Sequence, residues 1–249
     1  MIEPTATISP LGRSDGSAVY TCPATGFQIL GSVNGPIELP ARRDAQKPEE
    51  ATIEVLVKPA TAQSAIGERY VENILKALLG RVILGREKGF ARRGIVVTLL
   101  IQGSSGDGKI ERGDSYLPAL PALLHAALLA LLSAAIPLSM TYTSTVLAVD
   151  YSSKIIREPS LDDCAKAKSQ HVLAFSSKGH LLLNESQGPF DFDTWHRVYE
   201  EALSICRESK AVGQDGDVSM EAKHNLENFV RETVEHKIAS DYSWSDTAA

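Results

Sequence analysis

The stretch GSSGDGKIERGDSYLPALPALLHAALLALLSAAIPL, residues 103–138, constrains the arrangement of the rest of the chain. Its second half belongs to a segment without Asp, Glu, Lys or Arg that runs from Ser115 to Val149. A membrane-spanning helix needs about 20 consecutive apolar residues, whereas Pro118, Pro121 and Pro137 punctuate this run. Because proline fits the first turn of a helix or the residues after its end, the prolines predict a single helix bounded by them.

This predicted helix, from about Pro118 to Ala135, is apolar on nearly all sides, with His125 and Ser133 as interruptions. Such a helix is either a membrane span or the central buried helix of a large core. The segment after it, MTYTSTVLAV, is rich in β-branched residues and predicts a strand. We therefore predict a helix at the centre of the fold and no membrane segment.

The first half of the quoted stretch imitates a phosphate-binding loop, because Gly103–Lys109 reads glycine, four residues, glycine, lysine after an apolar run. That loop requires a Ser or Thr after the lysine to bind Mg²⁺, and a helix that begins there. Here Ile110 follows the lysine, and the predicted helix begins only near Pro118. The pattern favours a polar insertion, and an NTP-dependent enzyme is the alternative that binding of nucleotide would test.

The composition is that of an ordinary soluble protein: 249 residues, 43% hydrophobic and 22% charged. A formal net charge of −6 argues against an autonomous nucleic-acid binder, which normally carries a basic excess. Any RNA contact should therefore be local or shared with partner chains. Three separated cysteines without a Cys-x-x-Cys pair support neither a disulfide framework nor a zinc site, and we expect no cofactor. No secretory signal is visible at the N-terminus, which favours the cytosol or nucleus.

Hydrophobic periodicity predicts the other elements. In ATIEVLVKP apolar and polar residues alternate, which predicts a strand with one solvent-exposed face. GIVVTLLI is a continuous apolar run and predicts a strand buried on both faces. We expect further strands at SAVYT, at FQILGSV ended by Gly35-Pro36, at QHVLAFSS and at HLLLNES, and helices at about Ile66–Leu84, Phe192–Ile205 and Leu226–Ile238, followed by a frayed tail. Because helices and strands do not alternate strictly, the order predicts an α+β fold with a layered sheet.

Candidate catalytic residues are few. The six histidines form no metal-binding pair, and no Gly-x-Ser-x-Gly elbow supports a serine nucleophile. The pairs Asp162-Asp163 and Asp191/Asp193 stand where helices should begin, where capping explains acidic residues. Two pairs of adjacent basic residues occur in the sequence, Arg42-Arg43 and Arg92-Arg93. Each pair is interpreted as a solvated loop end or, alternatively, as a contact to phosphate.

Several short motifs occur along the chain in the same order as in RNase PH-like proteins, which they resemble. Arg13-Ser14-Asp15-Gly16 followed by a strand ending in Gly35-Pro36-Ile37-Glu38 resembles the family's opening, and EPSLDDCAKAKSQHVLAF resembles its second half. The resemblance covers about residues 11–210 and is strongest to the ring subunits of the eukaryotic RNA exosome. It implies a fold of two βαβα-type halves with central helices packed between sheets.

In active relatives a Gly-Thr-Arg at the start of the central helix holds phosphate, the attacking nucleophile, and an Asp-x-Asp acts at the scissile phosphate. The resemblance aligns Ala119 and Leu120 with the Thr-Arg pair, and Lys168 and Gln170 with the two aspartates. None of these side chains can take over the family's chemistry. The resemblance therefore implies a non-catalytic subunit; an active phosphorolytic 3′→5′ exoribonuclease with a rearranged site is the alternative.

The resemblance also implies a setting: a six-membered ring of RNase PH-like chains, cap proteins, and RNA in a central channel, in the nucleus and nucleolus and also in the cytoplasm. Arg42, Arg43, Arg92 and Arg93 are the expected RNA contacts, the last two preceding the strand expected to lie near the degenerate site. We expect an RNase PH-like domain over residues 1–210, with insertions at about 40–50 and 103–115, and a C-terminal helix and tail over residues 211–249.

Overall fold

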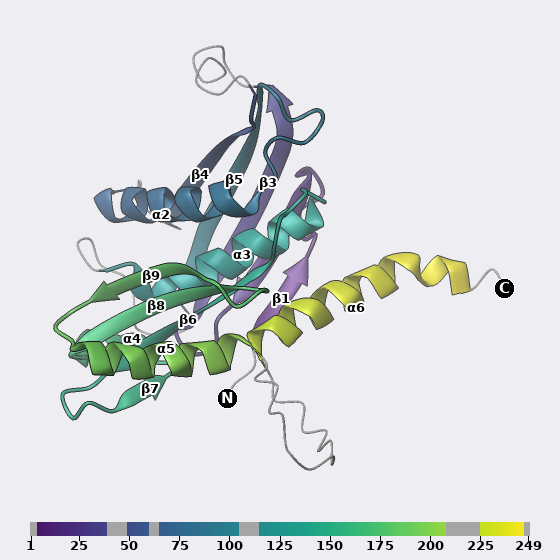
Figure 1. The fold of residues 1–249 in the computed structure, drawn as a ribbon. Helices are drawn as coiled ribbons and strands as arrows, with labels where there is room; N and C mark the ends of the chain where they lie inside the picture. The colour runs from purple at the N-terminus through teal and green to yellow at the C-terminus, as the bar shows by residue number, and fades with distance from the viewer. Residues whose placement is uncertain (1–3, 39–48, 60–64, 105–114, 208–224, 247–249) are drawn as a thin grey trace.

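The computed structural model describes residues 4–38, 49–59, 65–104, 115–207 and 225–246, and the side chains up to residue 243 (Figure 1). Two β-sheets form its framework. The first sheet has the strand order β1-β2-β3-β5-β4 and the second the order β7-β6-β8-β9. The strands are β1 (Thr5–Ile8), β2 (Gly16–Thr21), β3 (Phe27–Glu38), β4 (Thr52–Pro59), β5 (Arg93–Ser104), β6 (Tyr142–Val149), β7 (Ile155–Arg157), β8 (Ser169–Ser176) and β9 (Leu181–Gln187).

Two helices lie between the sheets. Helix α3 (Leu120–Ser133), preceded by the 3-10 turn η1 (Leu117–Ala119), contacts β2 and β3 on one side and β6 and β8 on the other. Helix α2 (Ile66–Val82) packs on β4, and the Arg81 guanidinium reaches the carbonyl of Leu182 on β9. Mixed sheets and helices with two central helices confirm the predicted α+β class. No helix within the described ranges is long and apolar enough to cross a membrane.

Helix α3 is central because its whole circumference is apolar: all of its residues from Leu120 to Leu131 are buried. Full burial of a leucine side chain contributes about 1.5–3 kcal/mol, so this helix is a large part of the core. Two glycines of the first sheet allow it to approach the strands. A Cβ on Gly16 would lie 2.3 Å from the backbone nitrogen of Ala134, and one on Gly31 would lie 2.9 Å from the carbonyl oxygen of Ala126.

The second sheet carries helices on its other face and at its edge. Helix α5 (Phe192–Cys206) packs on β6 and β8, forming a smaller core around Leu147, Leu173 and Phe175. The short helix α4 (Leu161–Lys166) precedes β8. Helix α6 (Leu226–Asp246) begins against β1, β6 and α3, and its far end projects from the body (Figure 1).

Two details differ from the sequence prediction. Strand β3 does not end at Gly35-Pro36 but continues to Glu38, because after a register shift Ile37 and Glu38 pair again with Gly94 and Arg93 on β5. The tail DYSWSDTAA is not frayed from its start, because α6 continues through Asp246; the Lys237 ammonium and the Asp241 carboxylate pair at 2.7 Å, one turn apart. Most of the predicted insertions, at 39–48 and 105–114, lies outside the described residues.

Candidate functional site

The start of the central helix is the place to look for an anion site, because helix N-termini present N–H groups to phosphate. Ala119 ends η1 and Leu120 begins α3, and both are 0% exposed. Their side chains point into the core cluster that also contains Leu117 and Leu123. The dipeptide therefore supplies neither a hydroxyl nor a cation to a bound anion.

The backbone at this helix start offers no unpaired donor from residue 117 to residue 121. The N–H of Leu117 donates to the Ser115 hydroxyl at 3.4 Å, and the N–H groups of Ala119 and Leu120 both donate to the Tyr116 carbonyl at 3.1 Å. Pro118 and Pro121 have no N–H. The two features that make a helix start attractive to phosphate, an anion-binding side chain and free N–H groups, are thus both missing here.

A buried carboxylate lies beside the same turn. The Tyr116 hydroxyl donates to Oε1 of Glu68 at 2.6 Å, and the N–H of Ala65 donates to Oε2 of the same residue at 2.7 Å. Glu68 is 3% exposed at the start of α2. Burial, followed by the hydrogen bond to Glu68, raises the pKa of Tyr116 well above its usual value. Sequence reasoning missed this pair, and its negative charge disfavours an anion at the start of η1.

The other predicted degenerate positions lie at the start of β8, a strand that contacts η1. The Gln170 side-chain amide donates to the Cys164 carbonyl at 2.6 Å, while its oxygen Oε1 is buried without a hydrogen-bond partner. Lys168 is half-buried, and its N–H donates to the Val149 carbonyl at 2.8 Å. The strand that begins beside these residues therefore contacts η1, and neither Lys168 nor Gln170 is a carboxylate.

Within the acidic pair before β8, Asp163 has the capping role that the sequence predicted. The Ser160 hydroxyl accepts a hydrogen bond from the Asp163 N–H at 3.2 Å, and the Asp163 carboxylate accepts one from the Ser160 N–H at 3.1 Å. This reciprocal pair caps α4. Hydrogen bonds from Ser160 lower the pKa of Asp163. Asp162 and Asp163 are exposed, and the described part of the chain has no cluster of His, Cys, Asp or Glu able to hold a metal ion.

The described doublet, Arg92-Arg93, lies at the other end of the first sheet. Arg93 begins β5 and pairs with Glu38, and Arg92 is exposed with a φ of 60°. Arg92-Arg93 precede β5 and lie at the end of that strand opposite to the end that η1 follows in the chain; the 12 residues of the strand span roughly 35 Å. Arg42 and Arg43 lie outside the described residues, in the segment that joins β3 to β4.

That segment nevertheless leaves and returns at the same end of the sheet. Glu38, which precedes it, pairs with Arg93, and Thr52, which begins β4, pairs with Gly94. Strand β5 lies between β3 and β4 in the sheet. The chain topology therefore brings Glu38 and Thr52, which stand before and after that segment, to either side of the start of β5.

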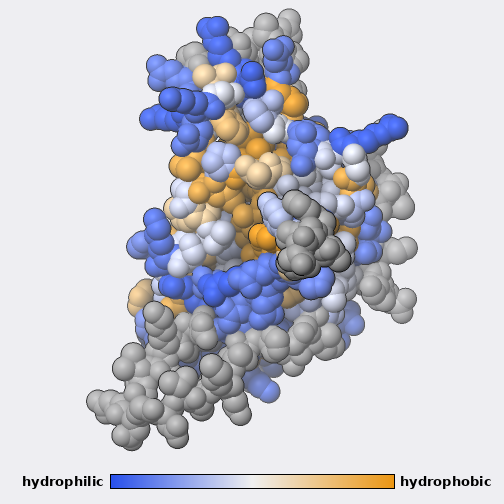
Figure 2. Space-filling view, turned by 90° about the vertical axis from the view of Figure 1, so that its right-hand side faces the viewer, coloured by the Kyte–Doolittle hydropathy of each residue, from blue (hydrophilic) through white to orange (hydrophobic). Residues whose placement is uncertain are grey.

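Apolar surface remains uncovered on the face of the first sheet that points away from α2 and α3. Leu30 on β3 pairs with Leu100 on β5, both are half-buried, and Leu56 on β4 is 39% exposed. Figure 2 views the molecule from the right-hand side of Figure 1 and shows apolar surface gathered above α6 between hydrophilic margins. Contiguous exposed apolar patches in soluble proteins mark contact sites for other molecules.

Comparisons with known proteins agree with this arrangement. No protein-family model matches the chain. The chain is 30% identical over 210 residues to the exosome complex component RRP46 of Saccharomyces cerevisiae, covering 82% of this chain and 90% of the relative. It is 30% identical over 182 residues to a protein of Oryza sativa subsp. japonica named exosome complex exonuclease RRP46 homolog, covering 73% and 66%.

Solved structures give the same result for the fold. The crystal structure of rice Rrp46 superposes with a TM-score of 0.70 at 25% identity, covering 82% of this chain and 88% of that one. The exosome of Archaeoglobus fulgidus with RNA bound to the active site matches with a TM-score of 0.62 at 12% identity, covering 81% and 84%. At that identity the likeness concerns the fold alone, and it confirms the predicted arrangement of two halves.

Proposed function

This chain belongs to the RRP46 family of RNase PH-like exosome ring subunits, and we propose that it serves its ring as a structural subunit without catalysing phosphorolysis. The observation that carries the proposal is the helix start at residues 117–121. Phosphorolysis needs inorganic phosphate held next to the scissile bond, and a preorganised set of donors is what holds such an anion. Here both side chains at the dipeptide are buried and apolar, and every backbone N–H is already paired or absent.

The charges around the turn support the same conclusion. The carboxylate of Glu68 lies where Tyr116 can donate to it, so an incoming phosphate would meet an anion near the turn. On β8, Lys168 and Gln170 replace the two carboxylates that the family resemblance aligns there. The carboxylates that would hold a metal ion or act as acid–base groups at the scissile phosphate are therefore absent from these two positions. Loss of either the phosphate-binding side chains or the aspartates at the scissile phosphate should abolish turnover.

A phosphorolysis assay on the purified chain, alone or assembled into a ring, tests the proposal. Poly(A) carrying a labelled 5′ end is incubated with inorganic phosphate, and nucleoside diphosphates are measured. We expect no phosphate-dependent release, and shortened RNA with released diphosphates would overturn the non-catalytic assignment. This outcome matters because the rice relative is named an exonuclease, so an active phosphorolytic 3′→5′ exoribonuclease is the competing function. A ring rebuilt with a catalytically active RNase PH-like chain provides the positive control.

For RNA contact we propose the arginine end of the first sheet: Arg42, Arg43, Arg92 and Arg93. A chain with a net charge of −6 can bind RNA locally where such arginines converge, because phosphate contacts need only a few well-placed cations. The described pair Arg92 and Arg93 is exposed. As a ring subunit the chain would work with homologous neighbours and cap proteins in 3′→5′ RNA processing and decay, in the nucleus and nucleolus and also in the cytoplasm.

The arginine proposal is tested in the assembled ring with single-stranded RNA. Replacing Arg92 and Arg93 with alanine should weaken binding and reduce the slope of log affinity against log salt by about 0.7 for each lost phosphate contact. Lys178→Ala, which removes an exposed cation from the β8–β9 turn of the other sheet, is the matched control. An unchanged slope in the double variant, or an equal loss in the control, would contradict the assignment.

We also propose that a ring neighbour covers the apolar outer face of the first sheet, defined by Leu30, Leu56 and Leu100. Leu56→Glu places a charge on this face with little effect on the fold, because Leu56 is already 39% exposed. It should prevent co-purification with RNase PH-like partner chains. Tyr151→Glu, at a residue that is 78% exposed in the β6–β7 turn, should leave co-purification intact. Normal assembly of the Leu56 variant would place the contact elsewhere.

A further inference from the structure

Helix α5 carries aromatic side chains that the core does not bury. Phe192 is 76% exposed, and Trp195 and Tyr199 are half-buried. The Phe192 ring stacks at 6.2 Å from the Trp195 ring and at 6.5 Å from the His196 ring, and the rings of Trp195 and Tyr199 are 5.6 Å apart. Because positions three and four apart are neighbours on a helix, these four residues form one aromatic row: Phe192, Trp195, His196 and Tyr199.

The aromatic row lies beside the buried face of α5 and next to strand β9. Val198 and Ala202, which are 0% exposed, form the buried face against the second sheet. The Trp195 indole N–H donates to the side-chain oxygen of Asn184 at 3.4 Å. Asn184 is exposed on β9, which is an edge strand of that sheet. The row therefore continues onto a polar sheet edge, and its first ring, Phe192, is open to solvent.

Carboxylates flank the aromatic row on its solvent side. Asp191 is the N-cap residue of α5, where the sequence predicts capping, yet its side chain accepts no hydrogen bond from the helix. Asp193 stands in the first turn, and Oε1 of Glu200 lies 3.4 Å from Nε2 of His196. At about 100° per residue, Asp193 and Glu200 lie side by side on the helix, next to Phe192 and His196. The helix dipole accounts for acidic residues in a first turn, but not for exposed rings beside them.

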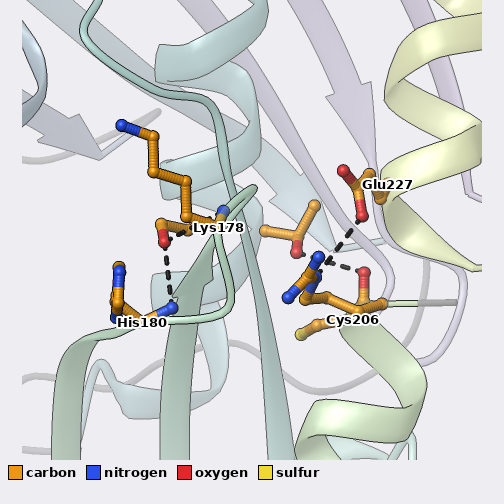
Figure 3. Close-up of polar contacts among 7 residues, drawn as sticks. Lys178, His180, Cys206 and Glu227 are labelled. Atoms are coloured by element: carbon orange, nitrogen blue, oxygen red, sulfur yellow. Dashed lines mark hydrogen bonds and ion pairs between the residues drawn. The ribbon is translucent and has the colours of Figure 1, made fainter. Parts of the chain in front are cut away.

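The helix that presents the row is held in place at its C-terminal end, as Figure 3 shows. The Thr143 hydroxyl donates to the Cys206 carbonyl at 3.3 Å, which holds the end of α5 on β6. The next residue, Arg207, forms an ion pair with Glu227 in the first turn of α6, with Nε and Oε2 separated by 3.8 Å. A surface whose position is fixed in this way loses less conformational freedom when it binds a ligand.

The two ends of α5 differ in charge. Lys178 and His180 are exposed in the β8–β9 turn at the C-terminal end, where Gly179 lies against the Arg207 guanidinium (Figure 3). The 15 residues of α5 separate these cations from the N-cap by about 22 Å. Arg197 is an exposed cation in the N-terminal half, and the three carboxylates beside the aromatic row outnumber it. The exposed end of the row therefore favours a cationic ligand.

We propose that the aromatic row binds an extended, arginine-bearing segment of another protein. A guanidinium is planar, so it stacks on an exposed ring while its N–H groups fork onto a carboxylate. Side chains on one face of an extended segment repeat about every 6.6 Å, close to the ring separations of 5.6–6.5 Å along the row. Two arginines separated by one residue therefore match the row. This binding role goes beyond the structural role in the ring.

The charges decide against RNA as the ligand of this surface. Bases of single-stranded RNA also stack on aromatic side chains, but proteins that use this mode pair the rings with a positively charged groove for the backbone. Here the side chains next to Phe192 and His196 are the carboxylates of Asp193 and Glu200. They repel phosphate and attract a guanidinium.

The proposal is tested by titrating the full chain with a labelled alanine-based peptide that carries two arginines separated by one alanine. The matched probe carries lysines at the same two positions and has the same charge. We expect the arginine peptide to bind about three- to tenfold more tightly, because an ammonium group neither stacks as a plane nor forks onto a carboxylate. Equal affinities for the two peptides, or no binding of the arginine peptide, would overturn the proposal.

Surface variants assign the binding to the row. Phe192→Ala removes a ring that is 76% exposed, so it should weaken binding of the arginine peptide about three- to tenfold at an unchanged melting temperature. Asp193→Asn combined with Glu200→Gln should weaken it roughly tenfold. Tyr151→Ala removes an equally open ring, 78% exposed in the β6–β7 turn, and should leave the affinity unchanged. Full binding by Phe192→Ala, or an equal loss in Tyr151→Ala, would refute the assignment.

The same variant distinguishes two other occupants. Phe192→Ala should leave the affinity of the chain for oligouridylate unchanged, and it should still co-purify with RNase PH-like partner chains. A loss of RNA affinity would show that the row stacks bases. A loss of co-purification would show that a ring neighbour covers it, and either result would overturn the proposal.

Discussion

Restoring the family's arginine at the start of the central helix should damage this protein instead of restoring a phosphate site. Leu120 is 0% exposed within the core, and the adjacent N–H groups are already bonded. Truncating such a leucine to alanine costs about 2–5 kcal/mol. For a chain of this length each kcal/mol lowers the melting temperature by about 2–4 °C, so Leu120→Ala should melt roughly 4–20 °C lower.

Leu120→Arg should destabilise at least as much as Leu120→Ala, because it adds a buried cation without a partner to the same lost packing. Leu120→Met keeps the volume and should cost less than about 1.5 kcal/mol. The assay is thermal and urea denaturation of the purified chain, with and without inorganic phosphate. If Leu120→Arg is as stable as the parent protein and phosphate raises its melting temperature, the helix start is an open anion site and our reasoning is wrong.

Three further predictions concern stability. Tyr116→Phe removes the hydroxyl that donates to Glu68 and should cost about 1–3 kcal/mol by urea denaturation. Because the folded pKa of Tyr116 is raised, the parent protein should also lose stability above about pH 10, and an equally steep loss in the variant would contradict this. Burial lowers the pKa of His125 and of His171 to about 4. Because the unfolded chain binds protons at these histidines before the folded one does, the free energy of unfolding should fall as pH drops from 6.5 toward 4. The slope should be shallower in His171→Gln, and a flat profile would refute the burial argument. Gly31→Ala should destabilise by about 1–3 kcal/mol through overpacking against Ala126, whereas Gly12→Ala, with open space around it, should be nearly neutral; equal effects would show that α3 can shift.

The central helix could be predicted from sequence because its signals are local. Prolines mark both ends of α3, and the absence of charge over residues 115–149 makes it apolar on every side. The alternation in β4 and the continuous apolar run in β5 were equally informative, since burial on one or both faces of a sheet determines those patterns.

Other features depend on contacts between distant segments, and no local pattern reveals them. Glu68 and Tyr116 are 48 residues apart and meet only in the folded chain. Arg92-Arg93 stand next to a strand whose sequence does not tell which end faces η1, so their distance from the start of the central helix could not be predicted. The last turns of α6 contain Ser and Asp, which have low helix propensity, and the helix nevertheless continues through Asp246.

The most direct test of the account is phosphate-dependent RNA degradation by an assembled ring. Every other RNase PH-like subunit of that ring carries an inactivating substitution, and this chain is left unchanged. Labelled RNA and inorganic phosphate are supplied, and nucleoside diphosphates are measured. We predict that the ring assembles, binds RNA and releases none. Nucleoside diphosphate release that depends on phosphate would show that the helix start of residues 117–121 still supports catalysis, and would contradict the central claim.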